Sequence, residues 1–249
     1  MLRGELRPTF RAFAHRGGAQ ERPENSLAAF QHAVDLGFVD LELDVRGTKD
    51  GVAVVHHDAT LNRTTDRVGR LNDLTWPHVA RARIHGRFPI MRLEELLARL
   101  PTTHLTVDAK DAMAVSALTA ALACVSDPGR VTVTSFSARR LKALRRDLPV
   151  SSAAHPGEVW RVWRGSRRGT IPQIEGQSLA VPKSIGRRTL LTPQFIHHAH
   201  SMGLPVYAWT INSETDMQAL IELGIDGIMT DRPTLLRYVL RRNDLWSNE

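Results

Sequence analysis

The sequence predicts an α/β protein folded as one TIM (β/α)8 barrel. Short apolar runs, which are typical of strand interiors, alternate with amphipathic stretches in which apolar residues recur every three or four positions. About eight such strand–helix units fill the 249 residues, and this is an ordinary length for a closed barrel. A doubly wound open sheet is the alternative, but no Gly-x-Gly-x-x-Gly follows the first strand.

The individual elements follow from the same periodicity. Strands are expected at residues 12–15, 38–45, 52–57, 104–109, 131–135, 150–154, 178–181, 205–210 and 227–230. Helices are expected at residues 26–36, 93–100, 111–125, 138–146, 193–202, 214–223 and 234–241. Ser137, Thr192 and Ser213 stand where N-caps are expected, and Gly203 and Gly224 stand where helices should end.

Two stretches interrupt the alternation. Residues 59–92 form a long insertion after an early strand, with Trp76 inside it, and long loops in compact domains are usually functional or disordered. Residues 158–170 combine Trp160 and Trp163 with arginines, for which we expect an arginine-bearing helix with its tryptophans packed inward. A contact with a lipid or a headgroup is the alternative. No linker divides the chain, so we expect a single domain over residues 1–249.

The chain is basic, with a formal net charge of +7. Only four of its 33 basic residues are lysines: Lys49, Lys110, Lys142 and Lys183. No zinc-finger spacing, long basic helix or RNA-binding signature accompanies this charge, so nucleic acid is not expected as a partner. A solvated arginine-rich surface is the simplest interpretation. The other is a positive field that attracts anionic phosphodiesters, with a transient contact at a membrane surface.

The remaining composition points to a cytoplasmic protein. The first residues lack the apolar stretch of a signal peptide, and no run approaches the ~18 apolar residues of a membrane span. The lone Cys124 excludes an internal disulfide, and its apolar helical neighbours predict a small buried residue. Neither the oligomeric state nor an alcohol headgroup has a signature in the sequence.

Acidic residues mark the ends of two predicted strands. Glu42 and Asp44 are two positions apart, so both side chains leave the same face of their strand. Two carboxylates on one face repel each other unless a positive group lies between them, and a hard cation such as Mg²⁺ or Ca²⁺ takes oxygen ligands. Asp108 and Lys110 repeat the spacing on another strand, as a third candidate ligand and a cation for a phosphate oxygen. Carboxylates paired with arginines are the alternative.

Histidines follow two early strands. His15 and His57 each close a predicted strand, and histidine titrates near neutrality, so one can donate a proton while the other accepts one. Alternation along the strand does not choose between His56 and His57. Arg16 offers a planar fork for phosphate oxygens, and the glycines after it allow a close approach of the backbone.

These motifs resemble the signature of the glycerophosphodiester phosphodiesterase family. The matching segments are His15-Arg16-Gly17, Pro23-Glu24-Asn25-Ser26, Glu42-x-Asp44-Val45, His57-Asp58, Leu61-x-Arg63-Thr64-Thr65, Leu93-x-Glu95-Leu96, Ser135-Phe136, Trp209-Thr210-Ile211-Asn212 and residues 224–233. The resemblance therefore covers residues 13–233 in order. It implies a TIM barrel related to phosphatidylinositol-phospholipase-C-like enzymes. It also implies hydrolysis of glycerophosphodiesters to glycerol 3-phosphate and an alcohol, dependent on one divalent cation.

The resemblance also implies residue roles. By it, His15 and His57 are the acid–base pair, and the His-Asp pairing favours His57 over His56. The implied metal ligands are Glu42, Asp44 and Asp108; the implied phosphate contacts are Arg16 and Lys110; and the implied apolar substrate walls are Trp209 and Phe136. Residues 59–92 correspond to a small extra segment over the barrel mouth.

One position departs from the family pattern. Most members have Glu-x-Lys where this chain has Asp108-x-Lys110. Because aspartate is one methylene shorter, we expect weaker metal binding or a preference for another ion. The main alternative activity is that of a lysophospholipase D, with the apolar residues after Trp76 and the tryptophans of residues 158–170 lining an acyl path. A non-catalytic phosphodiester-binding module and a nucleic-acid phosphodiesterase are weaker alternatives.

Overall fold

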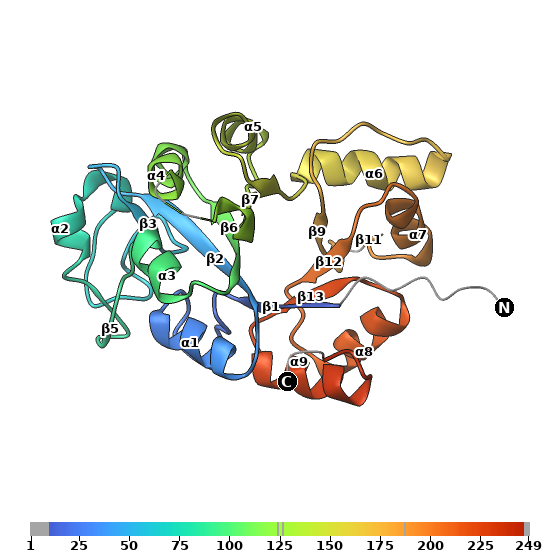
Figure 1. Cartoon of the computed structure of the whole chain (residues 1–249), viewed down its shortest axis with the longest axis horizontal. Helices are drawn as coiled ribbons and strands as arrows, with labels where there is room; N and C mark the ends of the chain where they lie inside the picture. Colours follow the sequence, from blue (N-terminus) through green and yellow to red (C-terminus); the bar gives the residue numbers. More distant parts are fainter. Residues whose placement is uncertain (1–9, 124, 126, 187, 247–249) are drawn as a thin grey trace.

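The fold is built around a ring of parallel strands surrounded by helices (Figure 1). The computed structural model describes residues 10–123, 125, 127–186 and 188–246. Within these residues eight parallel strands lie in the spatial order β8-β7-β6-β2-β1-β13-β12-β9. They are β1 (Arg11–His15), β2 (Asp40–Gly47), β6 (His104–Ala109), β7 (Val131–Thr134), β8 (Ser151–Ser152), β9 (Leu179–Pro182), β12 (Val206–Trp209) and β13 (Gly227–Thr230).

The ring closes between β8 and β9 through an isolated parallel bridge. Ala153 pairs with Ser178. The backbone N–H of Ala154 donates to the carbonyl oxygen of Ser178 at 2.8 Å, and that of Gln177 donates to the carbonyl oxygen of Ser152 at 2.9 Å. The predicted TIM (β/α)8 barrel is therefore confirmed.

Each barrel strand is followed by a helix on the outside of the ring. These helices are α1 (Leu27–Asp35), α3 (Leu93–Arg99), α4 (Ala112–Leu122), α5 (Ala138–Asp147), α6 (Pro156–Arg168), α7 (Pro193–Ser201), α8 (Glu214–Glu222) and α9 (Pro233–Arg242). The expected N-caps are confirmed, because Ser137, Thr192 and Ser213 each accept a hydrogen bond from the backbone N–H three residues on. Gly203 and Gly224 follow their helices with φ of 71° and 84°.

Successive side chains along a barrel strand point alternately towards the surrounding helices and into the ring. On β2, Leu41, Leu43 and Val45 are buried in the large apolar cluster shared with the helices. The alternate residues of β2 point into the ring. A separate cluster of Phe13, Tyr207 and Met229 packs inside the barrel, below the site described next. This division leaves the inner strand ends free to carry polar groups.

The predicted strand at residues 52–57 is not part of the ring. Strand β3 spans only Ala53–Val55 and pairs antiparallel with the end of β2, so β2 and β3 form a hairpin. The expected strand is therefore present, but it is shorter than predicted and lies outside the parallel ring, because an apolar run does not reveal the direction in which it pairs. His57 consequently lies in the loop after β3 and does not end a barrel strand.

The insertion after β2 is folded and has its own core. It contains a 3-10 helix (Leu71–Asp73), α2 (Trp76–Val79), β4 (Arg83–Ile84) and β5 (Phe88–Pro89). Its apolar cluster consists of Val54, Leu61, Leu71, Val79, Ala82, Ile84 and Ile90. Trp76 packs against this cluster, with the Arg92 guanidinium over its ring. In Figure 1 the insertion (α2 and β5, teal) lies at the opposite end of the molecule from α6 and α7.

Residues 158–170 form most of α6, as expected, but only one tryptophan packs inward. Trp163 is 9% exposed, whereas Trp160 is 44% exposed, because it lies at the edge of a cavity. After β9 the chain forms a hairpin of β10 (Ser184–Ile185) and β11 (Arg188–Thr189). Among the described residues no helix is long and apolar enough to cross a membrane. Cys124 and residues 1–9 lie outside the described residues.

Candidate active site

A cavity of about 450 Å³ lies at the carboxyl ends of the barrel strands. Eight of the nine residues expected at the site line it: His15, Arg16, Glu42, His57, Asp108, Lys110, Phe136 and Trp209. The ninth, Asp44, is fully buried directly behind this lining. Active sites of this fold lie at this end of the barrel, where the strand ends and the following loops meet.

Strand register explains why these side chains converge. His15 on β1 is level with Glu42 on β2, and Glu42 is level with Thr106 on β6. One step nearer the mouth, Asp44 is level with Asp108. Because side chains two positions apart share a face, the register places both rows on the inside of the ring.

The inner carboxylates are electrostatically distinct. Burial, together with the nearby charge of Asp44, raises the pKa of Glu42 well above its ordinary value. Burial also raises the pKa of Asp108, despite the nearby ammonium of Lys110. The pKa of Asp44 is lowered: burial opposes ionisation, but Lys110 and Arg16 outweigh it. Asp44 is therefore the carboxylate that the site holds most firmly in its charged form.

Lys110 lies between two of the predicted metal ligands. Its Nζ is 2.6 Å from Asp108 Oδ2, to which it donates a hydrogen bond, and 2.8 Å from Asp44 Oδ1. Within the described part of the chain, Oδ1 of Asp44 and Oδ1 of Asp108 are buried and accept no hydrogen bond of normal geometry. Buried carboxylate oxygens ordinarily accept hydrogen bonds, so Oδ1 of Asp108, and Oδ1 of Asp44 beside the Lys110 ammonium, are candidate oxygen ligands.

The chemistry of these donors fits a hard divalent cation. Glu42, Asp44 and Asp108 offer carboxylate oxygens at the barrel mouth, and among the described residues Oδ1 of Asp44 and Oδ1 of Asp108 accept no hydrogen bond of normal geometry. As the described residues stand, no three His, Cys, Asp or Glu side chains are gathered closely enough to form a metal cluster. The amino group of Lys110 occupies part of the space between the carboxylates.

His15 is held from both sides by carboxylates. Its Nδ1 is 2.6 Å from Asp231 Oδ1, and its Nε2 is 3.7 Å from Glu42 Oε2. Asp231 is itself fixed, since Asn212 Nδ2 donates to its Oδ2 at 2.8 Å. Burial lowers the pKa of His15, but Glu42 and Asp231 outweigh that effect and raise it above its ordinary value. The ring is thus oriented, and its cationic form is favoured.

His57 has the same arrangement on the other side of the cavity. Its Nδ1 is 2.7 Å from Asp58 Oδ1. His56, in contrast, is buried, its Nε2 lies 3.1 Å from the carbonyl oxygen of Thr60, and burial lowers its pKa. Only His57 of this pair lines the cavity.

Arg63 connects the loop that carries His57 to the loop that carries Arg16. It donates to both oxygens of Asp58, at 2.6 and 3.0 Å, and to both oxygens of Glu24, at 2.9 and 2.8 Å. Glu24 also accepts from Arg16 Nη1 at 3.2 Å, while Arg16 Nε is 3.0 Å from Asp44 Oδ2. One guanidinium therefore positions groups on both sides of the site.

The rest of the cavity wall is largely apolar. Phe136 meets Trp209 edge-on, with ring centroids 5.8 Å apart. Trp160 stacks on Trp163 at 4.6 Å, and both rings line the cavity together with Ile185 of the β10–β11 hairpin. No residue of the loop after Trp76 lines this cavity, so that loop does not form the part of its wall expected for an acyl path. The two tryptophans of α6, in contrast, form part of the cavity wall.

Several site residues have no role in the sequence-based assignment. Asp231 and Asn212 orient His15, and Asp58, Arg63 and Glu24 orient His57 and Arg16. Asp231 directly follows an apolar strand, a position that marks candidates in any barrel. Arg63 and Glu24 carry no such local signal, because their pairing joins segments 39 residues apart.

A barrel with two aspartate-held histidines, a cluster of carboxylates and two basic groups in one cavity belongs to the phosphoric diester hydrolases. The model of the "Glycerophosphoryl diester phosphodiesterase family" matches residues 15–235, and the chain belongs to this family. A Mycobacterium tuberculosis protein named "Probable glycerophosphodiester phosphodiesterase 2" is 36% identical over 243 residues, with 94% of this chain and 92% of the relative covered.

Two further proteins are similar to this chain over most of its length. A lysophospholipase D of Rattus norvegicus is 27% identical over 271 residues, covering 92% of this chain and 86% of that protein. An Oleispira antarctica phosphodiesterase, solved in complex with the product sn-glycerol-3-phosphate, superposes with a TM-score of 0.77 at 22% identity, over 93% of this chain and 96% of that one. At this identity, the similarity to the Oleispira structure shows a shared fold.

Proposed function

We propose that this chain hydrolyses glycerophosphodiesters to glycerol 3-phosphate and an alcohol, with His15 and His57 as the acid–base pair. The main support is that both histidines line one cavity with Nδ1 against an aspartate. With Nδ1 occupied, Nε2 is the nitrogen left to exchange a proton with a substrate. The product bound to the Oleispira relative has the chemistry of the proposed product.

The basic groups provide the phosphate contacts. Arg16 and Lys110 line the same cavity as the two histidines, and both lie within 3.0 Å of a carboxylate oxygen of Asp44. When a phosphodiester is bound, they orient its non-bridging oxygens and stabilise the negative charge that develops during displacement at phosphorus. One histidine removes a proton from the nucleophile, and the other protonates the departing alkoxide.

We further propose that Glu42, Asp44 and Asp108 hold one divalent cation, Mg²⁺ or Ca²⁺. This proposal is supported by the hard oxygen donor set and by the buried Oδ1 atoms of Asp44 and Asp108, which accept no hydrogen bond of normal geometry among the described residues. When bound, the cation withdraws charge from the phosphoryl oxygens and fixes the phosphate. Lys110, displaced from between the carboxylates, would then be available to a phosphate oxygen.

One experiment tests the activity and the metal requirement together. The protein is assayed on a panel of glycerophosphodiesters, such as glycerophosphocholine, glycerophosphoethanolamine and glycerophosphoglycerol, first with chelator and then with Mg²⁺ or Ca²⁺ restored. Glycerol 3-phosphate should appear only with a divalent ion. Full activity in excess chelator would refute the metal proposal, and no hydrolysis of any substrate would refute the activity.

Lysophospholipase D action is the second candidate function. The stacked pair of Trp160 and Trp163 lines the cavity together with Ile185, and these side chains offer an apolar wall for an acyl chain. The full-length similarity to the Rattus lysophospholipase D agrees with this reading. The two candidate functions are separated by an assay of lysophosphatidylcholine and glycerophosphocholine under the same conditions. A higher kcat/KM for the lysolipid would indicate that the wall binds the acyl chain.

A further inference from the structure

Helix α6 exposes arginines that have no counter-charge. Arg161, Arg164 and Arg168, called here the arginine row, are exposed, and within the described residues none of them makes a hydrogen bond or an ion pair. The one acidic residue of α6, Glu158, is buried and paired with Arg145 instead. The exposed charged residues of this helix are therefore all cationic.

Large apolar side chains lie beside the arginine row. Phe136, Trp160 and Ile185 are 60%, 44% and 61% exposed, and all three also line the cavity. They are called here the apolar rim. Trp160 is the direct neighbour of Arg161, so the cationic and apolar surfaces are continuous along α6. Exposed aromatic and aliphatic groups gathered at one opening indicate a surface that binds something apolar.

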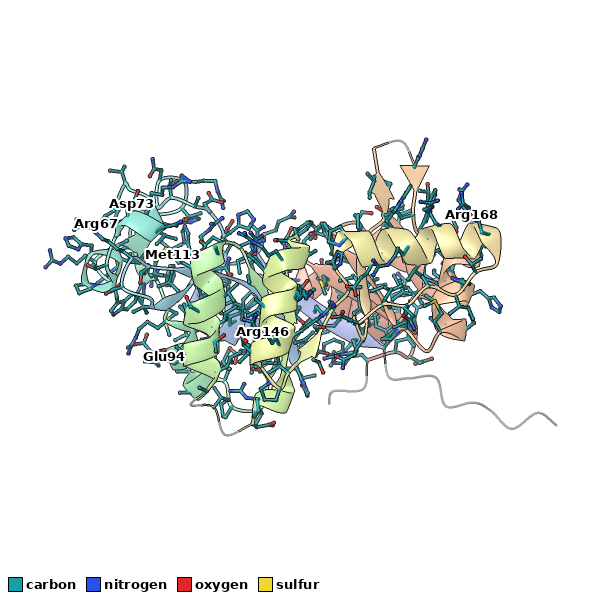
Figure 2. All side chains as sticks on the ribbon, turned by 90° about the horizontal axis from the view of Figure 1, so that it is seen from above. Arg67, Asp73, Glu94, Met113, Arg146 and Arg168 are labelled. Carbon is teal, nitrogen blue, oxygen red and sulfur yellow. The ribbon has the colours of Figure 1, made fainter. Side chains whose placement is uncertain are left out.

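The orientation of α6 presents both surfaces together. In Figure 2, α4 and α5 run vertically, whereas α6 lies nearly perpendicular to them, level with their upper ends. The β10–β11 hairpin, which continues from the carboxyl end of β9, projects above α6. The same view places Arg168 at the opposite end of the molecule from Arg67 of the insertion. The cationic surface thus borders one side of the barrel mouth.

We propose that α6 and the β10–β11 hairpin dock on an anionic phospholipid bilayer. An amphipathic surface with arginines on its polar side and tryptophan on its apolar side fits the interface of a membrane, where cations meet acidic headgroups and aromatic rings enter the boundary layer. A soluble polyanion would use the arginines but would leave the apolar rim in water. The bilayer uses both, and it brings the cavity mouth against the headgroups.

The test is binding of the intact protein to vesicles. Sedimentation is measured with vesicles of equal parts phosphatidylglycerol and phosphatidylcholine, and with vesicles of phosphatidylcholine alone. Binding to the anionic vesicles is expected, together with a blue shift of tryptophan emission. The combined Arg161→Gln, Arg164→Gln and Arg168→Gln variant should lose on the order of a hundredfold in partition, because each arginine near an anionic surface contributes about fivefold.

A matched control separates docking from net charge. Arg70→Gln, Arg81→Gln and Arg99→Gln remove the same charge from exposed positions on or near the insertion and should keep wild-type partition. Ile185→Ser should weaken vesicle binding and the emission shift without altering net charge. Hydrolysis of a soluble glycerophosphodiester should be unchanged in both arginine variants, so a failure of docking is distinguishable from a failure of catalysis.

Three results would overturn the proposal. They are the absence of binding to phosphatidylglycerol vesicles, an equal loss in the two triple variants, and binding to single-stranded DNA at least as tight as binding to the vesicles. The last result would assign the arginine row to a nucleic acid.

Discussion

Lys110 lies two residues after Asp108 at the same strand end, and its Nζ donates a hydrogen bond to Asp108 Oδ2 at a distance of 2.6 Å. The same ammonium is 2.8 Å from Asp44 Oδ1, so one cation neutralises two buried carboxylates. A divalent ion bound by Asp44 and Asp108 would take over that neutralisation. The site therefore has two ways to balance the same negative charge.

Lys110→Met is expected to separate these two ways. Without divalent ions, the variant leaves a buried carboxylate pair without its cation, which costs about 3 kcal/mol and lowers Tm by several degrees. Added Mg²⁺ or Ca²⁺ should raise Tm more in the variant than in the wild type, because the ion no longer competes with the ammonium. Thermal scans with and without the ion measure this, and Lys142→Met, at an exposed position, is the control. Equal ion-induced shifts in both proteins would contradict the prediction.

Asp108→Glu tests the departure from the family pattern. The added methylene restores the longer carboxylate, so we expect a lower divalent-ion concentration for half-maximal activity. Titration of activity with Mg²⁺ and with Ca²⁺ checks this and shows whether the ion preference changes. An unchanged or higher requirement would mean that Asp108 already reaches the ion and that its length is not limiting.

His15→Ala and His57→Ala should each lose roughly 10²–10⁴-fold in kcat, the range for removal of a positioned acid or base. Both variants should still show an ion-induced rise in Tm, because neither histidine belongs to the proposed ligand set. The exposed His78 supplies the control substitution, His78→Ala. Near wild-type turnover in either site variant would remove that histidine from the mechanism.

Arg63→Lys should lower kcat with little change in KM. Lysine lacks the planar fork that spans Asp58 and Glu24, so His57 and Arg16 lose their shared support, and a displacement of about 1 Å can cost 10²-fold in rate. In Arg63→Ala, added guanidinium should restore part of the activity, since the Arg63 side chain is half exposed. If activity and Tm both fall and added guanidinium restores no activity, Arg63 has a role in folding alone.

Glu158→Gln should change the pH dependence of stability. Burial opposes ionisation of Glu158, but hydrogen bonds from Arg145 and the backbone outweigh it and lower its pKa to about 2. A carboxyl with a depressed pKa stabilises the fold above its unfolded value near 4.5 and loses this contribution as the pH falls towards 2. Wild type should therefore exceed the variant in unfolding free energy by roughly 1.5–3 kcal/mol at pH 7, and the difference should vanish near pH 2. Urea unfolding at several pH values measures it; a constant difference would contradict this account.

The periodicity of apolar residues was enough to predict the barrel, but it was not enough to predict how every strand pairs. The parallel strands are local apolar runs followed by helices with visible caps, such as Ser137 and Ser213, and local signals of this kind survive in the sequence. The direction of β3 depends on a turn and on hydrogen bonds to β2, and neither can be read from three apolar residues. The same is true of the separate core of the insertion, whose members are spread over residues 54–90.

The candidate site shows the same difference between residues with a local signal in the sequence and contacts that depend on the folded chain. Glu42, Asp44 and Asp108 were predictable, because their i, i+2 spacing at strand ends decides where they point. Asp58 was also visible as the neighbour of His57, but the partner of His15 and the arginine that links the two loops were not predictable. Asp231 meets His15 across 216 residues, and Arg63 joins two loops, so both contacts depend on the closure of the barrel. Trp160 was misplaced because helical spacing cannot tell a buried stripe from one that borders a cavity.

Among the described residues, β8 and β9 are joined by one bridge, Ala153 with Ser178, and its two backbone hydrogen bonds, and this junction lies beside the apolar half of the cavity, next to Ala154, Val181 and Pro182. Of the groups proposed to act on phosphorus, His15, Glu42, Asp44 and Asp108 lie instead on β1, β2 and β6, which are joined by continuous runs of register. Most of the proposed reacting groups and the apolar wall thus lie on different strands of the ring. New leaving groups can therefore evolve through changes on either side of the junction, while the strands that carry the carboxylates and His15 stay fixed.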